Sequence, residues 1–310
     1  MTERAASLFK NRNFVFMLAM VLALTVGLDA GWTEPLLMPA LGLNMTLSVL
    51  DISNKDLSSM RRRPRPVLLS LLFNYVAMGG GMLLMARWLI RDVQIWGGFV
   101  TLAAMPPGIA AVPFSYMLGG NTVFALLGTA GLYLASLGIT PALMILFLGS
   151  DFVNPLRLLT ILGQLIVIPL VVSRLLIYRG LVERIKRWRD TVVTWSYFLV
   201  IYVIIGVNRE VFFAHHDILF EVVVIVLTVT FGLAHIIDFA ARRMNVDRST
   251  AISWVVVATM KNAGLASAVA ITFLGEKAAF PAGVIALFGV LLLLWLGFYY
   301  GKIRKRGGVP

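Results

Sequence analysis

The chain has 310 residues, of which 59% are apolar and only 14% are charged, and its mean hydropathy is +0.89. A soluble domain carries about a quarter charged residues, so the composition excludes an ordinary soluble enzyme and predicts a polytopic membrane protein. The 27 Lys and Arg against 15 Asp and Glu give a formal charge of +12, which fits a nucleic acid, an anionic membrane face or an anionic substrate. The absence of cysteine from the sequence excludes disulfides, thiolate metal sites and cysteine nucleophiles.

Ten apolar runs follow one another along the chain. A helix needs about 20 such residues to cross the hydrocarbon core of a bilayer, and fewer where it is paired with a broken helix. The runs lie at about 14–28, 35–50, 66–90, 93–118, 122–147, 156–178, 191–207, 217–240, 249–273 and 281–300. They predict an all-α membrane protein with ten transmembrane helices. We expect the lipid bilayer to surround these helices as a partner.

The basic residues are distributed unevenly between the two sides of this topology. If the N-terminus lies inside, twenty of the 27 fall on the inner face: Arg4, Lys10, Arg12, Lys55, Arg61, Arg62, Arg63, Arg65, Arg179, Arg184, Lys186, Arg187, Arg189, Arg242, Arg243, Arg248, Lys302, Arg304, Lys305 and Arg306. Inner loops of membrane proteins carry such an excess, which predicts a multi-pass protein of the cell (inner) membrane with both termini cytoplasmic. Topology accounts for the excess, so we expect no nucleic-acid partner.

Two of the ten runs are interrupted. The fourth contains MPPGIAAVP at 105–113, where three prolines each remove a backbone donor, and the ninth contains MKNAGLAS at 260–267. Gly264 follows Gly108 by 156 positions, which is close to half the chain. Two five-helix halves, 1–150 and 151–310, would enter the membrane in opposite senses, so the pattern predicts an inverted repeat with a site near the midplane, as in many secondary transporters.

Three stretches resemble the bile acid:sodium symporter family: RPRPVLLSLLFNYVAM at 63–78, MPPGIAAVPFSYMLGGNTVFALLGT at 105–129 and ISWVVVATMKNAGLASAVA at 252–270. The resemblance implies that the broken fourth and ninth helices cross in a core domain, at about 66–147 plus 217–273. It also implies a panel domain, at about 14–50 plus 156–207 plus 281–300. A member of this family is a carrier of organic anions, commonly driven by two sodium ions, and is not an enzyme.

The chain departs from the family pattern at the residues that hold sodium. Asn74 stands where the family has Gln, Ala111 and Val112 replace a Ser-Asn pair, Val257 replaces a Glu, and Lys261 replaces a Gln. Sodium is a hard cation that binds oxygens, usually with a carboxylate among them. Since all fifteen carboxylates fall in loops or near the ends of segments, we do not expect sodium sites of the family's type.

Lys261 is the one ionisable residue that the sequence places deep inside a span. A charge there costs about 2.5–3.5 kcal/mol on insertion scales and is a functional hypothesis by default. In one interpretation Lys261 substitutes for sodium, by neutralising a substrate carboxylate or by supporting the crossing, and transport is sodium-independent. In a second it exchanges a proton, and in a third it only hydrogen-bonds carbonyls freed by the helix break.

We therefore predict a secondary transporter of a small or amphipathic organic anion that works by alternating access, without cofactor, catalytic residue or metal. The alternatives are a sodium- or proton-coupled organic anion symporter and a non-transporting membrane sensor on the same scaffold. The substrate-binding residues are predicted to be Asn74, Pro107, Gly108, Thr129, Lys261, Asn262 and Gly264. Polar residues of second rank are Ser115, Asn121, Tyr133, Thr259 and Ser267.

Overall fold

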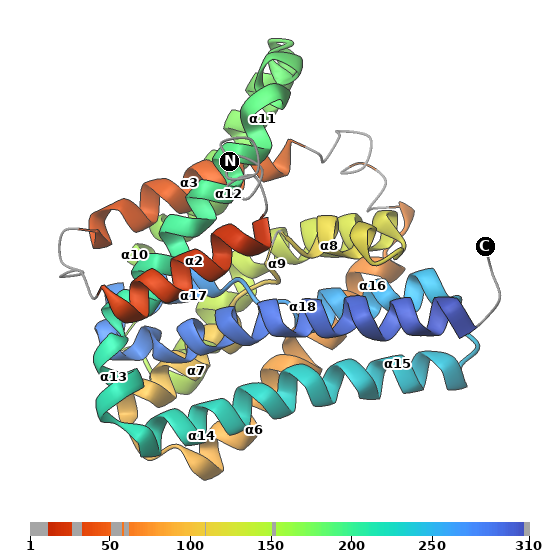
Figure 1. The fold of residues 1–310 in the computed structure, drawn as a ribbon. Helices are drawn as coiled ribbons and strands as arrows, with labels where there is room; N and C mark the ends of the chain where they lie inside the picture. The colour runs from red at the N-terminus through yellow and green to blue at the C-terminus, as the bar shows by residue number, and fades with distance from the viewer. Residues whose placement is uncertain are drawn as a thin grey trace, which may run out of the picture.

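A computed structural model describes residues 12–26, 33–50, 58, 62–108, 110–150 and 153–306. In this part of the chain the structure is helical throughout and contains no strand (Figure 1). The helices are α2(Arg12–Thr25), η2(Glu34–Leu36), α3(Leu37–Val49), α5(Arg65–Leu71), η3(Leu72–Gly79), α6(Gly80–Leu89), α7(Val93–Ala104), α8(Ala111–Met117), α9(Thr122–Leu148), α10(Pro155–Leu162), η4(Gly163–Val167), α11(Ile168–Tyr178), α12(Val182–Val207), α13(Arg209–Ala214), α14(His216–Leu227), η5(Thr228–Gly232), α15(Leu233–Arg243), α16(Arg248–Thr259), α17(Ala263–Leu274), η6(Glu276–Ala279) and α18(Phe280–Arg306). The prediction of an all-α protein is confirmed for the described residues.

Each of the ten predicted runs coincides with helical structure. Six continuous helices are long and apolar enough to cross a membrane: Arg65–Leu89, Thr122–Leu148, Pro155–Tyr178, Val182–Val207, His216–Arg243 and Glu276–Gly301. Shorter apolar helices lie at Phe14–Thr25, Leu37–Val49, Val93–Ala104 and Ala263–Leu274. These lengths and compositions are those of a multi-pass membrane protein, and the number of ten crossings stays a prediction.

The seventh segment is longer than the sequence reading had it. Hydropathy predicts a start at residue 191, whereas α12 begins at Val182 and includes the charged stretch VERIKRWRD as regular helix. Glu, Arg and Lys are good helix formers, so charge ends the apolar run without ending the helix. The helix thus begins nine residues, or about two and a half turns, before the predicted apolar run, and its first part carries basic side chains.

The helices form two groups in contact with one another. In one group α2, α3, α11 and α12 pack together; in the other α5 packs on α9, α7 on α9 and α17, and α16 on α9 and α15. Figure 1 shows α11 and the start of α12 extending away from the rest of the fold. The long helix α18 contacts α7, α14 and α17 as well as α12, and so joins the groups.

Side-chain oxygens cap the helices that matter for the site. Asp92 accepts from the first turn of α7, Asn121 from that of α9, Asp247 from that of α16, and Asn262 from that of α17. Asp and Asn are favoured at such positions because they satisfy backbone N–H groups that have no partner within the helix. These caps fix where α7, the first half of the broken fourth segment, and α16 and α17, the two halves of the broken ninth, begin; α8 begins without a side-chain cap.

A glycine allows the closest helix contact in the second group. A Cβ on Gly98 would collide with the backbone carbonyl of Ala278, so α7 and η6 reach their present separation only because residue 98 lacks a side chain. Phe99 of α7 and Phe280, which follows η6 at the start of α18, are fully buried. Removing large apolar side chains from water is the main favourable contribution at such a contact in a packed interior.

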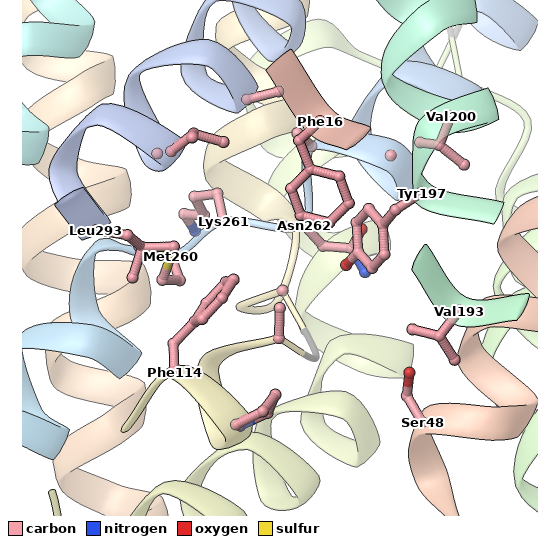
Figure 2. Close-up of a pocket in the computed structure, with 18 of the residues that line it drawn as sticks. Phe16, Ser48, Phe114, Val193, Tyr197, Val200, Met260, Lys261, Asn262 and Leu293 are labelled. Atoms are coloured by element: carbon pink, nitrogen blue, oxygen red, sulfur yellow. The ribbon is translucent and has the colours of Figure 1, made fainter. Parts of the chain in front are cut away.

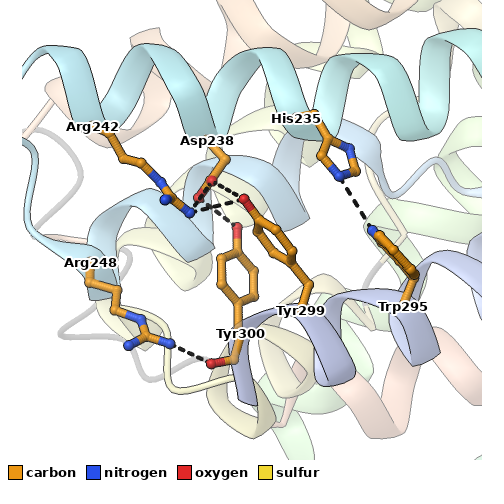
Figure 3. A network of polar contacts seen from close by, with 7 residues as sticks. All are labelled: His235, Asp238, Arg242, Arg248, Trp295, Tyr299 and Tyr300. Atoms are coloured by element: carbon orange, nitrogen blue, oxygen red, sulfur yellow. Dashed lines mark hydrogen bonds and ion pairs between the residues drawn. The ribbon is translucent and has the colours of Figure 1, made fainter. Parts of the chain in front are cut away.

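A polar network joins the ends of α15, α16 and α18 (Figure 3). The carboxylate of Asp238, which is 5% exposed, lies 2.6 Å from Arg242 and accepts from the hydroxyls of Tyr299 at 3.0 Å and Tyr300 at 3.2 Å. Arg248 donates to the backbone carbonyl of Tyr300 at 2.5 Å. Because a buried carboxylate without partners is costly, these contacts fix the register of α15 against α18.

Candidate functional site at the crossing of two helix breaks

The two interrupted segments meet through their backbones. Pro107 forms an isolated antiparallel bridge with Lys261. Two hydrogen bonds of 3.0 Å flank it: Gly108 donates to the carbonyl of the residue before Lys261, and Asn262 donates to the carbonyl of the residue before Pro107. A Cβ on Gly108 would lie 3.2 Å from the carbonyl oxygen of Lys261, so glycine keeps this approach close. Breaks predicted separately, 156 positions apart, thus form one structure.

Each break leaves backbone groups that the helices cannot satisfy. The helix α7 ends at Ala104 and α8 starts at Ala111, while α16 ends at Thr259 and α17 starts at Ala263. Irregular backbone at the depth of a membrane is tolerated only where protein or a water-filled cavity surrounds it. The carbonyls at the end of α7 are therefore expected to need a partner, and the structure supplies one.

That partner is the side chain of Lys261, which is 8% exposed. Its Nζ donates three hydrogen bonds of 2.9 Å, to Asn74 Oδ1 and to the backbone oxygens of Ala103 and Met105. The ring of Tyr75 lies 5.1 Å from the same nitrogen. An ammonium has three N–H donors, so all of them are used, and Lys261 forms no ion pair with the described part of the chain.

Asn74 connects the third segment to Lys261 and to the end of α16 in the ninth segment. It lies in the π-helical stretch η3, and its Nδ2 donates to the carbonyl of Val257 at 3.3 Å while its Oδ1 accepts from Lys261. π-Helical turns shift the side chains of a helix by a fraction of a turn and are frequent at functional sites. The amide therefore connects the third segment to the end of α16 and to the second break itself.

Asn262 has two roles beside the crossing. Its Oδ1 accepts from the N–H of Leu265 at 3.0 Å, which caps α17, and its Nδ2 donates to the hydroxyl of Tyr133 at 2.8 Å. The cap holds the start of α17, whose N-terminal end carries a partial positive charge. The bond to Tyr133 holds that start against α9.

A cavity of about 260 Å³ adjoins the crossing, between the two groups of helices (Figure 2). Its walls come from α2, α3, α8, α9, α12, α17 and α18 and from both breaks, and are mostly apolar. The predicted site residues that line it are Gly108, Thr129, Tyr133, Thr259, Lys261, Asn262 and Gly264. The structure thus places seven of the predicted residues, from three segments, at one cavity.

The other predicted residues lie elsewhere. Asn74 and Pro107 belong to the crossing behind the cavity wall. Ser115 and Asn121 are engaged in a separate cluster with α16, in which the Ser115 hydroxyl lies 2.7 Å from that of Ser253, and Ser253 donates to the Asn121 carbonyl at 2.9 Å. Ser267 is buried in α17 and its hydroxyl has no hydrogen-bond partner in the described chain. These three do not line the cavity.

Sequence reasoning missed several cavity residues. Phe16, Phe114 and Tyr197 form aromatic walls, and Arg189 with Asp190 lies at one end. From the sequence, Arg189 is predicted only as part of the basic inner face. The available signal was helical spacing, because Arg189 and Tyr197 are eight residues apart on α12 and share a face with the other cavity residues of that helix.

Acidic side chains are scarce at this site. Among the residues that line the cavity, the one carboxylate is that of Asp190, at the end away from the crossing break. Five predicted loop carboxylates, Glu3, Asp29, Asp51, Asp56 and Asp151, lie outside the described residues. The described part of the chain holds no cluster of three or more His, Asp or Glu side chains that suits a metal ion.

The family described as "Sodium Bile acid symporter family" matches residues 38–215, which include the third to fifth segments and the first helix break. The chain belongs to this family. The sequence-based resemblance is confirmed, and with it the assignment to a family of membrane transporters. Among curated proteins, the "Uncharacterized sodium-dependent transporter YocS" of Bacillus subtilis (strain 168) is 21% identical over 279 residues, 89% of this chain and 86% of that protein.

Proposed function

We propose that this member of the sodium bile acid symporter family is a secondary transporter of a small or amphipathic organic anion, in which Lys261 takes the place of a sodium ion. The observation that carries the proposal is the ammonium of Lys261, bonded to three oxygens at the crossing of the two breaks. Transport by this protein is accordingly sodium-independent, and it proceeds by alternating access.

The chemistry of the ammonium supports the substitution. Sodium and a protonated lysine each bring one positive charge to a set of oxygens, and hard cations are held by just such carbonyl and amide oxygens. A covalently attached cation holds Asn74 and the end of α7 together without an ion from solution. A second cation entering among the same oxygens would be repelled by the first.

The cavity fits an organic anion with an apolar body. Its aromatic and aliphatic walls offer burial, while Arg189, the Asn262 amide and the start of α17 offer charge or hydrogen bonds to an anionic group. In this proposal Lys261, through its three hydrogen bonds, holds the crossing together, and the positive charge of Arg189 at the cavity attracts the anionic substrate. Bonds to Ala103 and Met105 also fit a lysine that only satisfies carbonyls freed by the break, and the sodium dependence of transport distinguishes the two interpretations.

The arrangement of the halves supports alternating access between a core domain and a panel domain. Thr230 in η5 follows Asn74 in η3 by 156 positions, the same interval that separates Gly264 from Gly108. π-Helical stretches thus occupy matching places in the third and eighth segments, as the breaks do in the fourth and ninth. In our proposal ten spans form two inverted repeats in the inner membrane, with both termini cytoplasmic.

Counterflow in proteoliposomes tests this function. The labelled probe is whichever anion, in a screen of steroid conjugates and short carboxylates, raises the melting temperature of the purified protein most. A carrier exchanges the labelled anion outside for unlabelled anion inside, whereas a sensor on the same scaffold binds the anion and exchanges none. Binding without exchange would therefore refute the transporter.

A sodium-coupled carrier is the second candidate, and one observation favours it. The hydroxyl of Thr129, which lines the cavity, is buried and has no hydrogen-bond partner in the described chain, so it is an oxygen open to a ligand. The relative from Bacillus subtilis is also named as sodium-dependent. Exchange that stops when sodium is withdrawn would select this candidate.

A further inference from the structure

A second groove lies away from the crossing, between the end of α6, the start of α7 and the end of α9. It has a volume of about 720 Å³. Its apolar wall is formed by Gly80, Leu83 and Leu84 of α6, Trp96 of α7, and Leu146 and Phe147 of α9. No part of the transport cycle described above uses it.

Two guanidinium groups lie at one end of this groove. Arg87 and Arg91 both line it and are exposed, and neither makes an ion pair or hydrogen bond with the described part of the chain. The carboxylate next along the chain, Asp92, is engaged with Lys277 at 2.6 Å. A pair of arginines without an acidic partner is complementary to a phosphate, which accepts hydrogen bonds from several guanidinium donors at once.

The two arginines and the apolar wall on α6 lie at different depths, as the headgroup and the acyl chains of a lipid do. Arg87 lies near the end of the membrane-spanning helix Arg65–Leu89, and Gly80 lies about 10 Å deeper along it at 1.5 Å per residue. Trp88, 82% exposed, lies beside the arginines, as expected of an aromatic side chain at a membrane interface. The charged end is thus at headgroup level, and the part of the apolar wall formed by Gly80, Leu83 and Leu84 lies deeper, at acyl-chain level.

We infer that this groove is a binding site for one anionic phospholipid, with its phosphate between Arg87 and Arg91 and one acyl chain along Leu84, Leu83 and Gly80. Basic pockets between transmembrane helices bind anionic headgroups by the same charge complementarity. The lipid joins the third and fifth segments beside α7, the first half of the broken fourth segment. The site is separate from the substrate cavity, so it stands whether or not the proposed transport function holds.

Titration of the purified full-length protein with phosphatidylglycerol and phosphatidylcholine of identical acyl chains, followed by native mass spectrometry, tests the site. Phosphatidylglycerol is expected to bind at least about ten-fold more tightly, equal to about 1.4 kcal/mol. The double variant Arg87→Gln with Arg91→Gln should lose this preference. The matched control Arg179→Gln, which removes an exposed arginine elsewhere, should keep it.

Gly80→Leu separates a lipid site from simple attraction to charge. A Cβ at Gly80 meets nothing within 4 Å, so the protein accommodates leucine there while the side chain fills the groove. This variant keeps both arginines and should lose the tight binding of phosphatidylglycerol, and glycerol phosphate, which has no acyl chain, should not compete. Equal binding of the two lipids to the unmodified protein, or tight binding that persists in Gly80→Leu, would overturn the inference.

Discussion

The substitution Lys261→Gln tests how the crossing is held together. The ammonium satisfies three oxygens, on Asn74, Ala103 and Met105. A glutamine amide has only two N–H donors, so at least one of these oxygens loses its hydrogen bond in a buried setting. The variant also vacates the position of a cation among oxygens, which sodium from solution can then occupy.

The size of both effects follows from these contacts. One buried acceptor left without a donor costs about 1–3 kcal/mol of folding stability. Sodium at ten times its dissociation constant would return about 1.4 kcal/mol to the variant, and nothing to a site already filled by an ammonium. At about 2–4 °C per kcal/mol, the variant should melt several degrees lower, and sodium should restore a few of them.

Thermal unfolding in detergent, with sodium, potassium or choline chloride at about 150 mM, measures this. We expect the unmodified protein to melt at one temperature in all three salts, and Lys261→Gln to melt higher in sodium than in potassium or choline. Lys277→Gln is the matched control, because that lysine pairs with Asp92 at a partly exposed position and its loss should cost little. A sodium shift of equal size in the unmodified protein would refute the reasoning, as would a variant that melts at the unmodified temperature throughout.

Three further predictions concern other parts of the molecule. Gly98→Ala should cost about 1–3 kcal/mol of folding stability through overpacking and so lower the melting temperature. Gly42→Ala, whose Cβ meets nothing within 4 Å, should leave the melting temperature unchanged, and equal melting of the two variants would contradict the contact at Gly98. Asn262→Asp keeps the capping oxygen of α17 and replaces Nδ2 by an oxygen that can accept from the Tyr133 hydroxyl, but it places a negative charge at the cavity. The variant should therefore still fold and lose anion exchange, and unimpaired exchange would argue against an anionic substrate there. Burial raises the pKa of the Asp92 carboxyl, but its bonds to Lys277 and to the first N–H groups of α7 outweigh burial and leave that pKa below the usual 3.8. The stability it contributes is present above the usual pKa and lost as pH falls through the lowered one, so melting curves in acid should show a loss that Asp92→Asn lacks; the same acid dependence in that variant would exclude Asp92 as its cause.

The sequence was sufficient for those features of the fold that have local causes. Pro106 and Pro107 lack backbone donors and must interrupt a helix, while the polar run at Lys261 and Asn262 interrupts another at half-chain spacing. The two breaks meet in an antiparallel bridge, while the inverted repeat inferred from their spacing stays a prediction. Helix positions followed from apolar run length, which is the strongest signal in a chain of this composition.

Features that depend on tertiary contacts could not be predicted. Which oxygens surround Lys261 depends on the π-helical turn at Asn74 and on where α7 ends, and neither leaves a clear mark on the sequence. Hydropathy predicts a loop at the charged start of α12, because it measures the free energy of transfer to lipid and not the tendency to form a helix. For that reason the sequence predicts Arg189 only as one of the basic residues of the inner face, although it lines the cavity.

In the proposed mechanism the ammonium of Lys261 replaces a sodium ion at the crossing, so transport needs no sodium. The most direct test of this replacement is exchange of the labelled organic anion by proteoliposomes in which all sodium has been replaced by potassium, inside and out. We expect the initial rate to be unchanged by the replacement. An exchange that disappears without sodium and returns when sodium is added back would contradict the account.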